Sequence, residues 1–199
     1  MHTYVVRRHS IAAGAYELHD ALTRLRSTEE FRLASGVRWL HSYITRQPIG
    51  GFGLACVYEA DGEQALEQHA VLTRLPAHEI LPVVAMEALP DFAPTMVYLV
   101  RHRSAWRTPA ALVRSAALAR RMAEGSAASR VRWLRRYTVR ENDGMLGMIW
   151  LYQAVDPEAL MEHAASVGMS VDEIVPLIGR VVFRGDVPST PTHLDATVV

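Results

Sequence analysis

The stretch VRWLHSYI, from Val37 to Ile44, returns in the second half of the chain as VRWLRRYT, from Val131 to Thr138. At the same offset of 94 residues (131 minus 37), the first half matches the second without a gap from Tyr4 to Pro82. Self-similarity over such a length is typical of duplicated structural units. The repeated stretch therefore predicts two copies of one fold within the chain.

Each copy predicts the same order of strands and helices. Alternating apolar residues and β-formers indicate strands, whereas apolar residues at helical spacing indicate helices. The first copy reads as a strand at 3–9, a helix at 15–35, strands at 37–45 and 51–60, a helix that begins after an Asp61 N-cap, and a strand at 79–86. The order βαββαβ is the ferredoxin-like arrangement, in which both helices cover one face of a four-stranded antiparallel sheet.

The uncovered face of each predicted sheet must be buried against something. Two such sheets can cover each other within one chain, so we expect an α+β protein in which tandem ferredoxin-like βαββαβ repeats form an intrachain pseudo-dimeric α+β barrel. The expected boundaries are a first repeat at 1–86, a Pro-containing linker at 87–95, a second repeat at 96–185 and a loosely ordered tail at 186–199. The oligomer would be a monomeric pseudo-dimer or a homodimer.

Composition excludes several classes of function. The formal net charge is +0 and the pI is about 7.1, so we expect neither nucleic acid nor a membrane surface as a partner. No apolar run approaches the roughly 20 residues that span a bilayer, and no signal peptide opens the chain, which predicts a cytoplasmic protein. The chain contains no lysine and a single cysteine, which excludes lysine Schiff-base chemistry and an intrachain disulfide.

A family resemblance rests on the run VRWLHSYI…ACVYEADGEQALEQHAVLTRLPAHEILPV. Its Ser-Tyr strand, Cys-x-Tyr strand, His-bearing helix and Pro-Ala-x-x-Ile closing segment resemble small bacterial ferredoxin-like proteins catalogued as a domain of unknown function, one branch of which is named nickel-binding. The resemblance implies the fold, and it also implies a site for nickel or another divalent transition metal. Its ligands would be His9 and His69, with Cys56 or His41 as a third, since imidazole and thiolate suit such metals.

Large side chains with polar ends alternate along the repeated strand. Alternation predicts that Trp39, His41 and Tyr43 share one face, and that the corresponding residues of the second copy do so as well. If that face is turned toward the other sheet, it lines an amphipathic cavity for a ligand; if it is turned toward the helices, it is core. A histidine also recurs on the second helix of each copy, at His69 and His163, where it is either an acid–base group or a hydrogen-bonded core residue.

Two functions from different classes follow. The first is a small-molecule-binding enzyme that isomerises, cyclises or hydrolyses an anionic or aromatic substrate, in a pocket between sheet and helices of the first half or between the two sheets. The second is the metal-binding protein described above, and haem is a third, more distant option. For the enzyme, the expected catalytic residues are His69, His41 and Tyr43, and the expected substrate-binding residues are Trp39, Arg7, Tyr58, Trp133, Arg135, Tyr137 and His163. The other histidines, His102 among them, read as surface residues.

Overall fold

The structure is a computed structural model that describes residues 1–31, 34, 36–88, 96–124 and 130–184. Its elements, in order, are β1 (His2–Ala12), α1 (Ala15–Glu30), β2 (Val37–Arg46), β3 (Phe52–Ala60), α2 (Glu63–Thr73), β4 (Glu79–Ala88), β5 (Val97–Trp106), α3 (Pro109–Glu124), β6 (Val131–Arg140), β7 (Leu146–Ala154), α4 (Pro157–Ser166) and β8 (Glu173–Val182). The predicted order βαββαβ is thus present in each half. That this order arose by duplication stays a prediction.

The described residues form two compact units, which do not coincide with the two halves of the sequence. Among the described residues, unit 1 comprises 1–83 and 177–184, and unit 2 comprises 84–176. The strand β4 therefore begins in unit 1 and ends in unit 2, whereas β8 begins in unit 2 and ends in unit 1. The predicted linker at 87–95 begins inside β4, and its residues 89–95 lie outside the described residues, as does the predicted tail.

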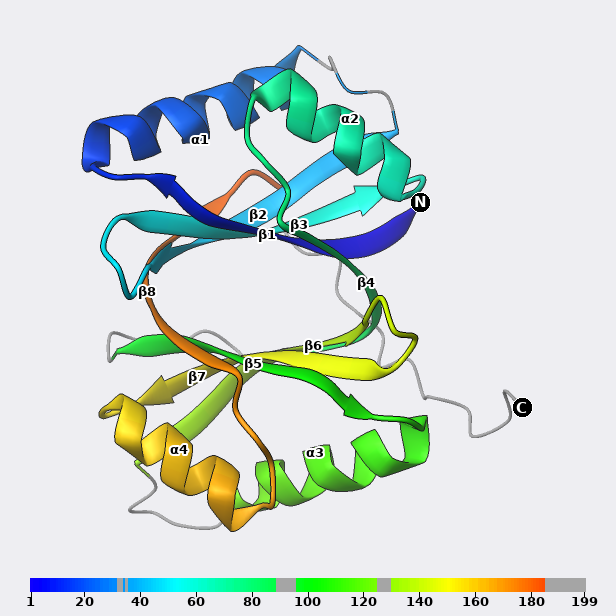
Figure 1. Cartoon of the computed structure of the whole chain (residues 1–199), viewed down its shortest axis with the longest axis vertical. Helices are drawn as coiled ribbons and strands as arrows, with labels where there is room; N and C mark the ends of the chain where they lie inside the picture. Colours follow the sequence, from blue (N-terminus) through cyan, green and yellow to red (C-terminus); the bar gives the residue numbers. More distant parts are fainter. Residues whose placement is uncertain (32–33, 35, 89–95, 125–129, 185–199) are drawn as a thin grey trace. The chain divides into compact units, whose positions relative to one another are not determined.

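Each unit has a sheet of five strands, of which β4 and β8 take part in both units. The helices of each unit lie on one face of its sheet (Figure 1). In unit 1 the hydrogen-bonded order is β4-β1-β3-β2-β8, and in unit 2 it is β8-β5-β7-β6-β4. The first four strands of each order are those of the ferredoxin-like arrangement, and β3 pairs antiparallel with both β1 and β2. The helices α1 and α2 cover the sheet of unit 1, and α3 and α4 cover the sheet of unit 2.

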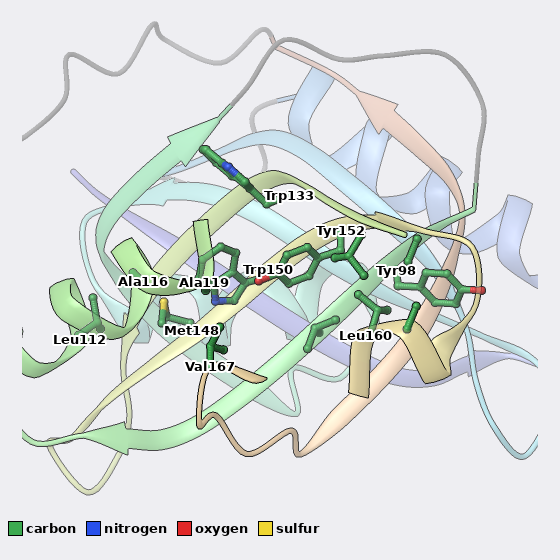
Figure 2. Packing of buried hydrophobic residues seen from close by; sticks show 14 of the residues in the cluster. Tyr98, Leu112, Ala116, Ala119, Trp133, Met148, Trp150, Tyr152, Leu160 and Val167 are labelled. Carbon is green, nitrogen blue, oxygen red and sulfur yellow. The ribbon is translucent and has the colours of Figure 1, made fainter. Parts of the chain in front are cut away.

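The layer between sheet and helices is the hydrophobic core of each unit. In unit 1 it includes Val6, Leu25 and Leu66 from β1, α1 and α2. In unit 2 it is richer in aromatic residues, and Figure 2 shows Trp150 beside Tyr152, with their rings stacked at 5.1 Å between centroids. Burial of such large apolar side chains is the main force that holds the helices to each sheet.

The predicted single face for Trp39, His41 and Tyr43 is wrong. The register between β2 and β3 shifts between Trp39 and His41, so that Trp39 lies opposite Tyr58 but His41 lies opposite Val57. An extra residue in one strand interrupts the alternation of side chains. Trp39 therefore packs in the core under the helices, whereas His41 and Tyr43 lie on the other face of the sheet.

The strand β6 repeats this irregularity. Its register with β7 shifts between Trp133 and Arg135, which separates Trp133 from Arg135 and Tyr137 in the same way. Trp133 belongs to the core of unit 2, where the guanidinium carbon of Arg120 lies 5.4 Å from the centre of its ring.

A second irregularity follows the middle of the first strand of each half. The register shifts after Arg8 in β1 and after His102 in β5. Ser10 and Ser104 then adopt φ angles of +48° and +44°, which are uncommon for residues other than glycine. Strained backbone of this kind is concentrated at functional sites. Arg8 and His102, which precede it in their strands, are therefore candidates for functional residues.

The N-terminus of α2 differs from the prediction, because its N-cap is Gly62 and makes no side-chain cap. The predicted cap, Asp61, instead lies 3.7 Å from the N-terminal amine. At the matching position of α4, Asp156 accepts a hydrogen bond from the backbone N–H of Ala159 at 2.7 Å. The second half therefore has the capped version of this helix.

We expect Asp156→Ala to lower the free energy of unfolding by about 1 kcal/mol, because a backbone N–H of α4 loses its acceptor. The reciprocal change, Gly62→Asp, is expected to raise it by a few tenths of a kcal/mol, since Gly62 has extended backbone and open space at its Cβ position. Urea unfolding of both variants checks this. A loss of stability in Gly62→Asp would contradict the assignment of Gly62 as the N-cap.

Among the described residues, no helix is both long and apolar enough to cross a membrane.

Candidate functional site

Three polar side chains meet inside the core of unit 1, between the sheet and α2. They are Arg8 from β1, Tyr58 from β3 and His69 from α2, and we call them the Arg8 cluster. Their exposed fractions are 1%, 0% and 1%. The guanidinium carbon of Arg8 lies 5.7 Å from the centre of the Tyr58 ring, and the Tyr58 and His69 rings are 5.0 Å apart between centroids. The cluster is therefore compact and shielded from water.

The Arg8 guanidinium has unused hydrogen-bonding capacity. Its Nε, Nη1 and Nη2 atoms are all buried and have no hydrogen-bond partner among the described residues. A cation over an aromatic ring gains up to about 2 kcal/mol when it is desolvated, which is less than the several kcal/mol needed to bury the charge. Buried polar groups in proteins are nearly always hydrogen-bonded, so the unsatisfied guanidinium indicates that a group beyond the described residues completes the site.

His69 and Tyr58 are also left with unmet hydrogen bonds. Neither ring nitrogen of His69 has a partner among the described residues, and the buried Tyr58 hydroxyl has no geometrically sound hydrogen bond there either, although the Cys56 thiol lies near it. Burial, assisted by the positive charge of Arg8, lowers the pKa of His69 from 6.5 to about 3. Burial also raises the pKa of Tyr58 well above its usual value of 10, although Arg8 acts in the opposite direction. At neutral pH the cluster therefore holds one cation, a neutral imidazole and a neutral phenol.

The other polar groups near the cluster are already paired. The Glu29 carboxylate accepts a hydrogen bond from the backbone N–H of Trp39 at 3.1 Å and forms an ion pair with Arg184 at 2.7 Å. The indole N–H of Trp39 donates to the Ser42 hydroxyl at 2.9 Å. These contacts order the surroundings of the cluster.

Unit 2 has a tyrosine and a histidine at two of the three corresponding positions, and a histidine in place of the arginine at the third. His102, Tyr152 and His163 lie 94 residues after Arg8, Tyr58 and His69, and we call them the His102 cluster. The Tyr152 and His163 rings are 5.6 Å apart between centroids, close to the 5.0 Å of the first pair. The three residues line a small pocket at the C-terminal end of α4, with room for about one water molecule. Apolar side chains complete the lining: Val100, Leu160, Ala164, Val167 and Met169.

Several predicted site residues lie on the other face of the unit 1 sheet. The His41 and Tyr43 rings meet edge to face at 5.1 Å, and the guanidinium carbon of Arg180 lies 5.6 Å from the centre of the Tyr43 ring. Arg7 belongs to this face because it alternates with Arg8, and it lies opposite Glu79 in the register with β4. Arg7, His41 and Tyr43 are buried, but they do not contribute to the Arg8 cluster.

The corresponding face of unit 2 is internally paired. Arg101 forms a buried ion pair with Glu141 at 2.7 Å, and Arg135 donates to the Tyr137 hydroxyl at 3.5 Å. A Cβ atom on Gly147 would overlap the Glu141 carboxylate, so this glycine makes room for the ion pair. The roles predicted for Arg135 and Tyr137 in substrate binding stay predictions.

The predicted metal ligands are not brought together. Cys56 and His69 lie in the core of unit 1, whereas His41 lies on the other face of the sheet. His9 lies beside His78, and the backbone N–H of His9 donates a hydrogen bond to the Nδ1 atom of His78 at 3.1 Å. No group of three or more His, Cys, Asp or Glu side chains that could hold a metal ion occurs within the described ranges. The four-residue ligand set implied by the family resemblance is therefore not formed.

Two residues of these clusters escaped the sequence analysis. The sequence predicts substrate binding by Arg7 and not by its neighbour Arg8. It also predicts His102 at the surface, whereas only 1% of His102 is exposed. The repeat was the one sequence signal that relates these two residues. The offset of 94 aligns Arg8 with His102 on the face shared with Val6, and the irregularity after each strand position could be seen only in three dimensions.

No family model matches the chain, and no curated protein matches it. Among solved structures, a protein from Lactobacillus acidophilus with a provisional monooxygenase name has a TM-score of 0.51 at 10% identity, over 95% of this chain and 100% of that one. A similarly named protein from Fusobacterium nucleatum scores 0.47 at 10% identity, with coverage of 92% and 95%. A haem-binding protein from Thermus thermophilus scores 0.45 at 12% identity, with coverage of 88% and 90%.

Only the first of these three scores exceeds 0.5, and its low identity means that it shows the fold alone. The chain therefore shares its α+β fold with the Lactobacillus acidophilus protein. The nickel-binding branch expected from the sequence has no counterpart in these comparisons. Any activity must be argued from the side chains of this chain.

Proposed function

We propose that unit 1 binds a small anionic molecule at Arg8 and that His69 and Tyr58 exchange protons with it. The observation that carries this proposal is the fully buried guanidinium of Arg8, which has no hydrogen-bond partner among the described residues. Guanidinium groups bind carboxylates through two parallel hydrogen bonds, which makes a carboxylate the best-matched ligand class. The proposal retains the enzyme predicted from the sequence but moves its anion-binding group from Arg7 to Arg8.

The protonation states of the cluster suit acid–base chemistry. A neutral imidazole can accept a proton, and a neutral phenol can donate one or hold an oxyanion by a hydrogen bond. An anion paired with Arg8 would offset its positive charge, and this removes one of the two causes that depress the pKa of His69. Ligand binding would therefore make His69 a stronger base. Isomerisation, cyclisation and hydrolysis of a small acid are the reaction types that need only such groups.

A screen of small anions tests the binding. Formate, acetate, benzoate and inorganic phosphate are added to the wild type, and the melting temperature is measured. A ligand at 100 times its Kd stabilises the folded state by about 2.7 kcal/mol, which for a chain of this size raises the melting temperature by roughly 5 to 10 °C. If buried water alone satisfies Arg8, none of these anions will raise the melting temperature, and the proposal is then wrong.

Proton uptake is the second expected consequence of anion binding. Because the bound anion raises the pKa of His69 from about 3 toward its ordinary 6.5, binding at pH 5 should take up a fraction of a proton per ligand. Calorimetry in two buffers of different ionisation enthalpy measures this fraction. The His69→Leu variant is the control and should bind the anion without that uptake. Equal uptake in both proteins would remove His69 from the site.

A further inference from the structure

We infer that the small pocket of unit 2 is a binding site for one ordered water molecule, which joins His102, Tyr152 and His163 in a single hydrogen-bonded network. The lining of the pocket comes from β5, β7, α4 and the turn that follows α4. All of these segments belong to unit 2, so the site is complete within that unit. It is separate from Arg8 and does not depend on the function proposed for unit 1.

His102 offers the water an acceptor. The Nδ1 atom of its ring is hydrogen-bonded to the backbone carbonyl of Ser170. A carbonyl can only accept, so Nδ1 carries the proton and the Nε2 atom of the neutral ring is left as an acceptor. Only 1% of His102 is exposed, so a partner for Nε2 has to lie inside the pocket.

His163 and Tyr152 supply the other two partners of the water. The Nε2 atom of His163 is buried and has no hydrogen-bond partner in the described part of the chain. The His163 and Tyr152 rings are 5.6 Å apart between centroids, and both rings line the pocket. The Tyr152 hydroxyl can donate one hydrogen bond, and Nε2 of His163 accepts or donates according to its tautomer. Three polar groups therefore border one small volume.

A water molecule matches this set of groups. It can donate to Nε2 of His102, accept from the Tyr152 hydroxyl and pair with Nε2 of His163 in either tautomer. Buried waters typically make about three hydrogen bonds to polar groups that would otherwise be unsatisfied, and the pocket has room for about one of them. The apolar side chains of Leu160 and Val167 leave no polar surface for a second water on their side of the pocket. Figure 2 shows both of these side chains in the packed core of unit 2.

An ion is a poorer match for the pocket than water. The residues that line it carry no charged side chain, and the nearby Asp172 carboxylate already accepts a hydrogen bond from the backbone N–H of Arg103 at 2.7 Å. Burial lowers the pKa of His102 and of His163, which keeps both rings neutral at physiological pH. An ion would lose its hydration without gaining a charged partner, whereas water loses little. The two units therefore differ, because the cation Arg8 of unit 1 is replaced in unit 2 by a neutral histidine and a water.

A crystal structure of the full chain, at a resolution that shows ordered water, tests the site directly. We expect density for one water within about 2.7 to 3.2 Å of three atoms: Nε2 of His102, Nε2 of His163 and Oη of Tyr152. An empty pocket would overturn the inference. A direct hydrogen bond between the two imidazoles, or a metal ion identified by its anomalous scattering, would overturn it as well.

The side-chain ¹⁵N resonances of His102 and His163 test the same network in solution. Tyr152→Phe removes one hydroxyl from the water, so we expect the Nε2 resonances of both histidines to shift. Tyr98→Phe is the matched control, because Tyr98 lies opposite Tyr152 in the register between β5 and β7 but does not line the pocket. It should leave both resonances unchanged, and urea unfolding checks that each variant is folded.

Two results of these spectra would contradict the shared water. A shift confined to one histidine in Tyr152→Phe would indicate a direct hydrogen bond from the tyrosine, and no shift in either would remove the hydroxyl from the network. Acetate added to the wild type should leave both resonances in place, because its charge would be unpaired in this pocket. Shifts of both histidines on addition of acetate would assign the pocket to an anion and overturn the inference.

Discussion

Replacement of Arg8 by Met is expected to stabilise the ligand-free protein by about 1 to 4 kcal/mol and, at the same time, to abolish its response to anions. Arg8 is a buried cation without a hydrogen-bond partner among the described residues, and its ring contact with Tyr58 offsets only part of the desolvation. Methionine is similar in length and removes the charge. Urea unfolding gives the free energy, and thermal shift with acetate or benzoate gives the loss of binding.

Arg7→Met is the matched control for this change. Arg7 is the neighbouring residue, is equally buried and lies on the opposite face of the same strand. We expect this variant to gain no stability and to keep the response to anions. If Arg8→Met is strongly destabilised, the guanidinium has a structural role, and if Arg7→Met alone abolishes binding, the anion site lies on the face of His41 and Tyr43.

Acid should destabilise the protein strongly through His69. The pKa of His69 is about 3 in the folded state and 6.5 when unfolded, so the unfolded chain binds more protons between these two values. Stability from this group is therefore complete above pH 6.5 and is lost as the pH falls toward 3. Over this pH range, the difference in pKa corresponds to a loss of about 5 kcal/mol in the free energy of unfolding. This is a large share of the roughly 5 to 15 kcal/mol by which domains are stable.

The His69→Leu variant isolates this contribution, because leucine fits an apolar helix face and does not titrate. Its free energy of unfolding, measured in urea from pH 7 down to pH 4, should fall less steeply than that of the wild type. His19→Gln, at an exposed position of α1, should follow the wild-type curve. Parallel curves for wild type and His69→Leu would show that His69 is protonated or hydrated in the folded state.

Local patterns in the sequence were sufficient to predict the elements of the fold. The apolar spacing of α1 and the alternation in β1 depend on neighbouring residues, and these segments form the predicted helix and strand. The N-terminus of α2 was predicted less well, because Asp61 and the adjacent Gly62 both suit a cap, and the choice between them depends on where the chain enters the helix.

The face of each side chain on β2 required the tertiary structure. Alternation predicts one face for Trp39 and His41 only if the strand is regular, and one extra residue reverses the prediction for everything beyond it. That irregularity depends on the pairing with β3, which lies outside the local sequence. The ends of β4 and β8 also required the tertiary structure. The last residues of β4 belong to unit 2 and the last residues of β8 belong to unit 1, opposite to what the two halves of the sequence suggest.

By itself, the sequence determined the order of strands and helices, the repeated histidine on α2 and α4, and the alternation that separates Arg7 from Arg8. These features follow from periodicity and spacing along the chain. Only the tertiary structure decided that all three guanidinium nitrogens of Arg8 lack a hydrogen-bond partner among the described residues and that His102 lines a small pocket. Hydrogen-bond satisfaction depends on which atoms of distant segments come within reach, and the spacing of residues along one strand does not contain that information.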